Sequence, residues 1–190
     1  AEGPEGATML VCDVTDENSV AALAALVLKQ TGRIDLLVNN AGIGLLAGAE
    51  ESSVAQVQGL FDVNLFGVVR MTNAVLPSMR QRRAGRIINI GSILGLVPAP
   101  YSAHYSAAKH AVECYSESLD HEVRTRGIRV SIVEPAYTKT QFDANLLEPD
   151  AKLDEYREVR AALGKKMKEL LAGADQPGVV ADVVLKVARE

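Results

Sequence analysis

Tyr105 and Lys109 are the two residues whose types and spacing most directly suggest chemistry. They lie four residues apart in Tyr101-Ser-Ala-His-Tyr105-Ser-Ala-Ala-Lys109, which reads as the start of a helix, so both side chains fall on one helical face. A tyrosine titrates at about 10 in water, and a lysine cation beside it moves that pKa toward neutrality. Such a phenol can protonate a carbonyl oxygen or take a proton from an alcohol. The same spacing also arises on solvated helices, but of the five tyrosines only Tyr105 has a lysine four residues on.

The elements that would position this pair alternate between strand-like and helix-like patterns. Short apolar runs predict strands at 7–12, 34–38, 85–91 and 128–133. Apolar residues at helical spacing predict a helix from Thr15 to Gly32 and further helices over 52–83, 102–126, 151–172 and 177–189. Pro77 would kink or divide the helix over 52–83. This alternation predicts one α/β domain over 1–190, a doubly wound parallel sheet with helices on both faces.

Polar and glycine residues follow the predicted strands at their carboxyl ends, where a parallel sheet binds its ligand. These positions are Asp13, Asn39-Asn40-Ala41-Gly42, Ser92 and Glu134-Pro135. Ser92 and Tyr105 come from consecutive elements, so a hydroxyl, a phenol and an ammonium would meet in one crevice. Plainer roles stay open, because Ser92 also suits a helix cap, and Asp13, Asn39 and Asn40 suit turns.

The motifs, taken in order, resemble those of the short-chain dehydrogenase/reductase family. Asn39-Asn-Ala-Gly42 is similar to its NNAG motif, and Asp62-Val-Asn64 holds its helix asparagine. Asn89-Ile-Gly-Ser92 holds its serine, Tyr105-x-x-x-Lys109 its active-site pair, and 135–140 its P-G-x-x-x-T segment. Ser92 precedes Tyr105 by thirteen residues, which is typical of the family.

The resemblance implies a Rossmann-like αβα fold and a role for each matched residue. Tyr105 would be the general acid or base, and Ser92 would hold the substrate oxygen. Lys109 would lower the pKa of Tyr105 and reach the ribose of the cofactor, NAD or NADP, while Asn64 would hold a water that links Lys109 to solvent. The implied cofactor-binding residues are Asp13, Val14, Asn40, Ala41, Gly42, Tyr105, Lys109, Pro135 and Thr140.

The function implied is an NAD(P)-dependent oxidoreductase (EC 1.1.1.-) that interconverts a secondary alcohol and a ketone, with a mostly apolar small-molecule substrate. Residues 141–173 would form the substrate lid, and Gly44-Leu45-Leu46 is similar to hydroxysteroid and retinol dehydrogenases. The candidate pocket or cover residues of the lid are Phe142, Leu146, Leu147, Leu153 and Leu163. Family members pair through the long helices, here 52–83 and 102–126, which implies a homodimer or homotetramer. The alternative is a non-catalytic binding or oligomerisation subunit of the same fold, although such a subunit has no need of the full Asn64, Ser92, Tyr105 and Lys109 set.

The sequence departs from the family pattern in two mild ways and one large one. Gly91 stands where the family often has a serine, and Ala136 where it often has a glycine. The family's first βαβ unit, with its glycine-rich T-G-x-x-x-G-x-G loop, and its last strand have no match in this chain. We therefore expect them to lie outside it, and with them the segment that separates NAD from NADP.

Two other motifs are disfavoured. Gly42-Ile-Gly44-Leu-Leu-Ala47 fits the dinucleotide fingerprint, but the acidic residue that should end the next strand, Asp62, lies in a helical pattern. A Ser-His-Asp hydrolase is disfavoured because Gly91-Ser-Ile-Leu-Gly95 is not a G-x-S-x-G elbow, and the three histidines read as helix-surface residues.

The composition narrows the function classes further. The 190 residues carry a net charge of −4, which disfavours nucleic acid and anionic membrane as partners. No apolar run reaches the length of a membrane span, and the first residues do not read as a signal peptide. Cys12 and Cys114 lie in apolar stretches, which predicts buried thiols in a reducing cytoplasm. The few Cys and His residues offer no zinc-ligand spacing.

Overall fold

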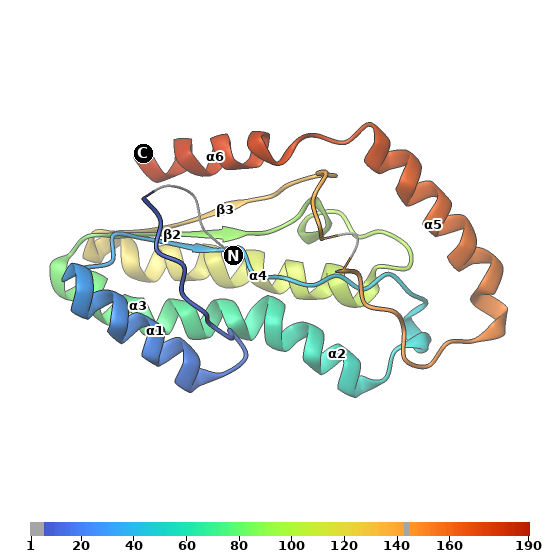
Figure 1. Cartoon of the computed structure of the whole chain (residues 1–190), viewed down its shortest axis with the longest axis horizontal. Coiled ribbons are helices and arrows are strands. Elements are labelled where there is room, and N and C mark those ends of the chain that lie inside the picture. Colours follow the sequence, from blue (N-terminus) through green and yellow to red (C-terminus); the bar gives the residue numbers. More distant parts are fainter. Residues whose placement is uncertain (1–5, 143–144) are drawn as a thin grey trace.

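Three parallel strands form the sheet of this α/β domain in the computed structural model, which describes residues 6–142 and 145–190 (Figure 1). They are β1 (Leu36–Asn39), β2 (Gly85–Ile90) and β3 (Ile128–Val133), side by side in that order. Leu37 pairs with Ile87, which pairs with Val130. Because the strands are parallel and in this register, their carboxyl ends lie at one edge of the sheet.

Helices cover both faces of this sheet, which confirms the predicted doubly wound α/β class. α3 (Gly67–Arg82) and α4 (Ala103–Val123) lie on one side, and α6 (Pro177–Arg189) lies on the other (Figure 1). α1 (Glu17–Thr31) packs beside α3, and α2 (Val54–Phe61) precedes α3 along the chain. α5 (Arg157–Ala172) lies beyond one end of the sheet (Figure 1). In the part of the chain that the structure describes, no helix is long and apolar enough to cross a membrane.

The main core lies between the sheet and the helices α3 and α4. Val75 and Met79 lie one turn apart on α3 and face Leu37 and Ile87 of the sheet. The buried members of this cluster are Leu37, Val75, Met79, Ile87, Leu119, Ile128 and Val130. Burying such side chains contributes about 1.5–3 kcal/mol each to stability. This packing fixes the position of α4, which carries Tyr105 and Lys109, relative to the strands.

Helix ends follow the signals expected from the sequence. The carboxylate of Asp16 accepts a hydrogen bond from the backbone N–H of Asn18 at the start of α1, and Gly32 ends this helix with φ at 75°. Gly127 precedes β3 with φ at 72°, and a Cβ there would lie 2.0 Å from the carbonyl oxygen of Arg83. Glycine is therefore required where the chain enters β3.

The prediction of a buried strand at 7–12 is wrong. These residues form no strand, and the side chain of Val11 is 100% exposed. A strand is stabilised by ladder hydrogen bonds to a neighbour, and the described chain offers this segment no neighbouring strand. The prediction of buried cysteines also fails for Cys114, which is exposed on α4, while Cys12 is half-buried.

The helix predicted over 52–83 is interrupted, although not at Pro77, which stays inside α3. The interruption is a π-helical segment, Asp62–Phe66, between α2 and α3. A π-turn inserts an extra residue into a helix and occurs often at functional sites. Here it contains Asn64, one of the four predicted catalytic residues.

Candidate active site

Lys109 is buried next to the carboxyl end of β2. Its side chain is 6% exposed, and its Nζ donates a hydrogen bond of 2.8 Å to the carbonyl oxygen of Ile90. The same Nζ lies 5.8 Å from the centroid of the half-buried Tyr105 ring, one turn earlier on α4. Burial disfavours the charged ammonium and lowers the pKa of Lys109 to about 8, against the attraction of the Glu113 carboxylate. The predicted pair is therefore brought together, with a cation that titrates close to neutrality.

Asn64 and Gly42 lie beside this ammonium. The Asn64 side chain accepts a hydrogen bond of 2.8 Å from the backbone N–H of Ile43 and donates one of 2.8 Å to its carbonyl oxygen. A Cβ on Gly42 would lie 3.2 Å from Asn64 Oδ1 and 3.9 Å from Lys109 Nζ. Asn64 thus fixes the backbone after β1, and glycine at 42 leaves the approach to the ammonium open.

Ser92 begins the short turn that follows β2. Its Oγ accepts a hydrogen bond of 3.2 Å from the backbone N–H of Leu94, so it caps the single 3-10 turn Ile93–Gly95. The carbonyl oxygen of Pro135 accepts a hydrogen bond of 3.0 Å from the N–H of Ile93, which ties the end of β3 to this turn. The cap interpretation of Ser92 is correct, and the side chain lies at the strand edge that the catalytic role also requires.

Of the predicted cofactor residues, three line one pocket, Pro135 lines another, and two are exposed. Val14, Asn40 and Ala41 line one small pocket of about 70 Å³ beside the end of β1. Asp13 is exposed, and its carboxylate accepts hydrogen bonds from Thr15, which lower its pKa. Thr140 is exposed, and its Oγ1 accepts a hydrogen bond of 3.1 Å from the N–H of Phe142. Among the described residues, Asp13 therefore acts as the turn residue that was the alternative interpretation of its position.

An apolar strap, Phe142 with Asn145–Leu147, lies over Tyr105. The Phe142 and Tyr105 ring centroids are 5.8 Å apart, and the N–H of Leu147 donates a hydrogen bond of 2.8 Å to the carbonyl oxygen of Gly44. A Cβ on Gly44 would lie 2.4 Å from Leu146 Cδ2. The strap fits closely because position 44 has no side chain. Of the predicted lid residues, Phe142 thus packs against the Tyr105 ring, while Leu146 and Leu147 hold the strap at Gly44; residues 143–144 lie outside the described chain.

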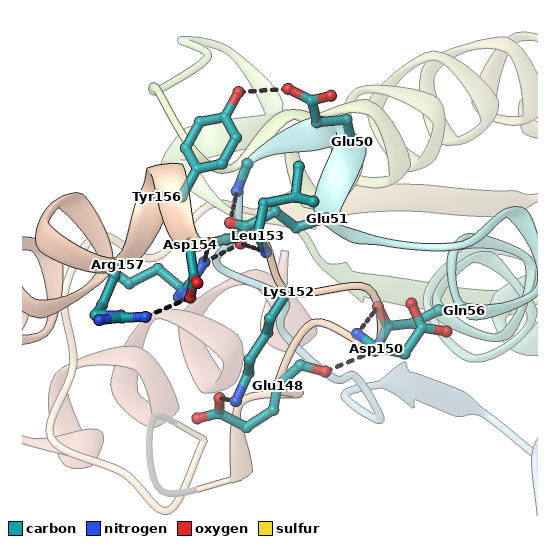
Figure 2. Close-up of polar contacts among 12 residues, drawn as sticks. Glu50, Glu51, Gln56, Glu148, Asp150, Lys152, Leu153, Asp154, Tyr156 and Arg157 are labelled. Atoms are coloured by element: carbon teal, nitrogen blue, oxygen red, sulfur yellow. Dashed lines mark hydrogen bonds and ion pairs between the residues drawn. The ribbon is translucent and has the colours of Figure 1, made fainter.

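A polar clasp joins the segment that follows the strap, 148–160, to the start of α2 (Figure 2). Its centre is Glu51, whose side chain is 0% exposed and forms an ion pair with Arg160. The Glu51 carboxylate also accepts hydrogen bonds of 3.0 Å from the N–H groups of Gly48 and Leu153. Figure 2 shows the hydroxyl of Tyr156 reaching Glu50, at 2.7 Å, on the outer side of the clasp. The clasp holds α5 against the body of the domain, and sequence reasoning missed it.

Two further polar features near the site were also missed. The Asn39 side chain donates a 2.8 Å hydrogen bond to Asn89, which donates one of 2.7 Å to Ser116, so a buried amide chain crosses from β1 to α4. Glu113 lies buried one turn after Lys109 on α4. A lysine and a glutamate four residues apart were visible in the sequence, but such pairs usually lie on solvated faces. Nowhere in the described ranges do three or more potential metal ligands gather.

Comparison with known proteins gives consistent matches. The family profile described as short chain dehydrogenase matches residues 1–151. A 3-ketodihydrosphingosine reductase of Bacteroides thetaiotaomicron is 45% identical over 137 residues, which cover 72% of this chain and 51% of that protein. Retinol dehydrogenase 8 of Bos taurus is 38% identical over 188 residues, which cover 95% of this chain and 60% of that protein.

Two solved structures share the fold. A short-chain dehydrogenase from Streptomyces avermitilis superposes with a TM-score of 0.76 at 37% identity, covering 85% of this chain and 61% of that one. A structure described as ElxO with NADP bound gives a TM-score of 0.68 at 34% identity, covering 72% and 58%. The chain thus spans between about half and three fifths of the length of these relatives.

Proposed function

The chain belongs to the short-chain dehydrogenase/reductase family, and from this premise we propose that the complete protein is an NAD(P)-dependent oxidoreductase that interconverts an alcohol and a carbonyl compound. The observation that carries the proposal is the buried Lys109 ammonium, 2.8 Å from the Ile90 carbonyl oxygen and below the Tyr105 ring. A buried cation beside a phenol favours the phenolate, which is the form that accepts a proton.

Tyr105 gives its proton to the carbonyl oxygen during reduction and takes one from the alcohol during oxidation. Lys109 stabilises the phenolate that remains after the proton has left. Ser92, at the rim of the same strand edge, donates a hydrogen bond that holds the substrate oxygen. Asn64 contributes indirectly, because its side chain holds the backbone of Ile43 in place through two hydrogen bonds.

A nicotinamide cofactor, when bound, would supply or accept the hydride. The residues present fit such a group, because Gly42 leaves space over the ammonium and Val14, Asn40 and Ala41 line one pocket. A solved relative is described with NADP bound, which supports NADP, and NAD stays open. Lys109 would reach the ribose hydroxyls as a hydrogen-bond donor.

An apolar substrate suits the surroundings of the phenol. Phe142 packs against the Tyr105 ring, and Leu146 and Leu147 add apolar surface to the same strap. The two relatives described above are named for 3-ketodihydrosphingosine and for retinol. We therefore propose a lipid ketone or a lipid alcohol as the substrate, with the segment 141–173 as its cover.

The test is a reductase assay of the complete gene product with NADPH and NADH, on 3-ketodihydrosphingosine, retinal and a small ketone. Tyr105→Phe should lower the rate of carbonyl reduction by about 10²–10⁴-fold, because it removes the acid hydroxyl. Nicotinamide fluorescence should show that cofactor binding is retained. Tyr101→Phe is the matched control, since Tyr101 has no lysine four residues on, and its activity should stay within about twofold of wild type. Turnover retained in Tyr105→Phe would exclude the assigned role.

A further inference from the structure

Glu113 is a buried carboxyl that the mechanism above does not use. It lies on α4 four residues after Lys109, and its side chain is 8% exposed. Glutamate is rarely buried unless a cation or several hydrogen-bond donors surround it.

The turn that carries Ser92 is shaped around this carboxyl. A Cβ on Gly91 would lie 2.5 Å from Glu113 Oε1, and a Cβ on Gly95 would lie 2.8 Å from the same atom. Real Cβ atoms do not approach an oxygen so closely, so two glycines flanking Ser92 leave the space that the carboxyl fills. Glu113 is thus packed on the turn that follows β2, one turn after Lys109 on its own helix.

The carboxyl is surrounded by charge, and one of its two oxygens lacks a hydrogen-bond partner in the described chain. Within the described chain, Glu113 Oε1 has no hydrogen-bond partner. The charged groups that face it are Glu134 at the end of β3, and Lys109 and Glu117 on α4. Burial, and then the Glu134 carboxylate, raise the pKa of Glu113 to about 7, against the attraction of Lys109. Glu113 and Lys109 therefore both change charge close to neutral pH.

We propose that Glu113 is a positioning residue of this active site, whose carboxylate keeps the proton on Lys109 and which acts on the reaction only through that ammonium. The proposal rests on the function proposed above. It follows from the placement of Glu113 one turn after Lys109 on α4, where both side chains are buried, with an attraction between the two charges. Glu113 touches neither substrate nor cofactor, so its effect is on the pH at which Lys109 is charged.

The first test measures the charge of Lys109 without any turnover. The protein is labelled with ¹³C at lysine Cε, and the Lys109 resonance is assigned by its absence in Lys109→Arg. Glu113→Gln should weaken proton binding at Lys109 by about three- to tenfold, which moves the midpoint to lower pH, because the attracting carboxylate is gone. Glu122→Gln, an exposed glutamate on the same helix, should leave the midpoint unchanged. In the wild-type protein, the Lys109 resonance should also show a second inflection near pH 7, where Glu113 ionises. This measurement needs no variant.

The second test measures the pH profile of kcat/KM for carbonyl reduction in the same variants. In Glu113→Gln the alkaline limb should move to lower pH by the shift seen at Lys109, while KM on the acid side stays unchanged. Glu113→Asp, which keeps the charge, should restore part of the shift.

The outcomes separate this proposal from the proposed function. A Lys109 midpoint unchanged in Glu113→Gln, together with a single wild-type inflection, overturns the role of Glu113. Turnover retained in Tyr105→Phe instead overturns the proposed function, whatever the lysine resonance shows. A shifted midpoint with an unmoved pH profile shows that Glu113 controls Lys109 but that the reaction does not depend on it, and this also overturns the positioning role.

Discussion

Glu51 and Glu113 are both buried glutamates, with 0% and 8% exposed side chains, yet their surroundings are opposite. The Glu51 carboxylate meets the Arg160 guanidinium and two backbone N–H groups. The Glu113 carboxyl meets two glycine backbones and a second carboxylate, and in the described chain its Oε1 has no hydrogen-bond partner.

The difference shows that surroundings, and not burial alone, decide what a buried carboxyl does. A buried carboxylate with a cation and several donors fastens the segments that supply them, so removal of one partner is strongly destabilising. A carboxyl buried beside a second carboxylate holds its proton to higher pH and can change charge under working conditions. In this molecule the first kind, Glu51, closes the clasp, and the second, Glu113, lies one turn after Lys109 on α4.

The largest expected effect is that of Glu51→Gln. The amide keeps the shape of the side chain but leaves the Arg160 guanidinium without its carboxylate, so the free energy of unfolding should fall by about 3 kcal/mol. Urea unfolding of the complete protein measures this fall. Glu50→Gln is the control, because the Glu50–Tyr156 hydrogen bond is exposed, and it should cost under about 1 kcal/mol. Equal losses in the two variants would remove the distinction between the buried centre of the clasp and its outer side.

The glycines that face the two carboxyls give a second, smaller contrast. Gly91→Ala should lower the free energy of unfolding by about 1–3 kcal/mol, because its Cβ would lie 2.5 Å from Glu113 Oε1 and 2.9 Å from Ile132 Cγ2. Gly48→Ala should cost less, because its nearest contact would be Glu51 Oε2 at 3.1 Å. The same unfolding curves report both values, and combining Gly91→Ala with Glu113→Ala should recover part of the loss. A Gly48→Ala variant less stable than Gly91→Ala would contradict the tighter fit at Glu113.

The smallest effect expected is in the pH dependence of stability. Folding raises the pKa of Glu113 from 4.5 to about 7, so the folded state holds this proton more tightly than the unfolded state does. The resulting stabilisation is present below pH 4.5 and is lost as the pH rises toward 7. The pKa of Lys109 is lowered to about 8, so ionisation of Lys109 makes the stability depend on pH only above that window.

The melting temperature of Glu113→Gln should therefore fall less than that of wild type between about pH 5 and pH 7. Glu122→Gln is again the matched control. Parallel melting curves for wild type and Glu113→Gln across this range would show that Glu113 does not titrate there.

The sequence predicted that Tyr105 and Lys109 lie close together because this signal is local. Their spacing on one helix, and the polar residues that follow each strand, indicate a candidate site without knowledge of distant contacts. The segment 7–12 was mispredicted because an apolar run describes a strand only when a neighbouring strand is present to pair with it.

The two glutamates were missed for different physical reasons. Glu51 meets Arg160 across more than a hundred residues of chain, and no short pattern in the sequence encodes that contact. Glu113 stands four residues after Lys109, but the same pattern usually marks a solvated ion pair. Its burial depends on Gly91 and Gly95, which become its neighbours only after α4 packs on the turn beyond β2.

The π-helical segment Asp62–Phe66 allows α2 and α3, which follow each other without a break, to bury different faces. A regular helix turns about 100° per residue, so a single extra residue rotates everything before it relative to everything after it by about that angle. The face of α3 that carries Val75 and Met79 can therefore stay on the sheet while Asn64 points at the loop after β1. A one-residue deletion in this segment would restore a regular helix, and it would rotate Asn64 and the buried Leu60 of α2 relative to the face of α3 that packs on the sheet.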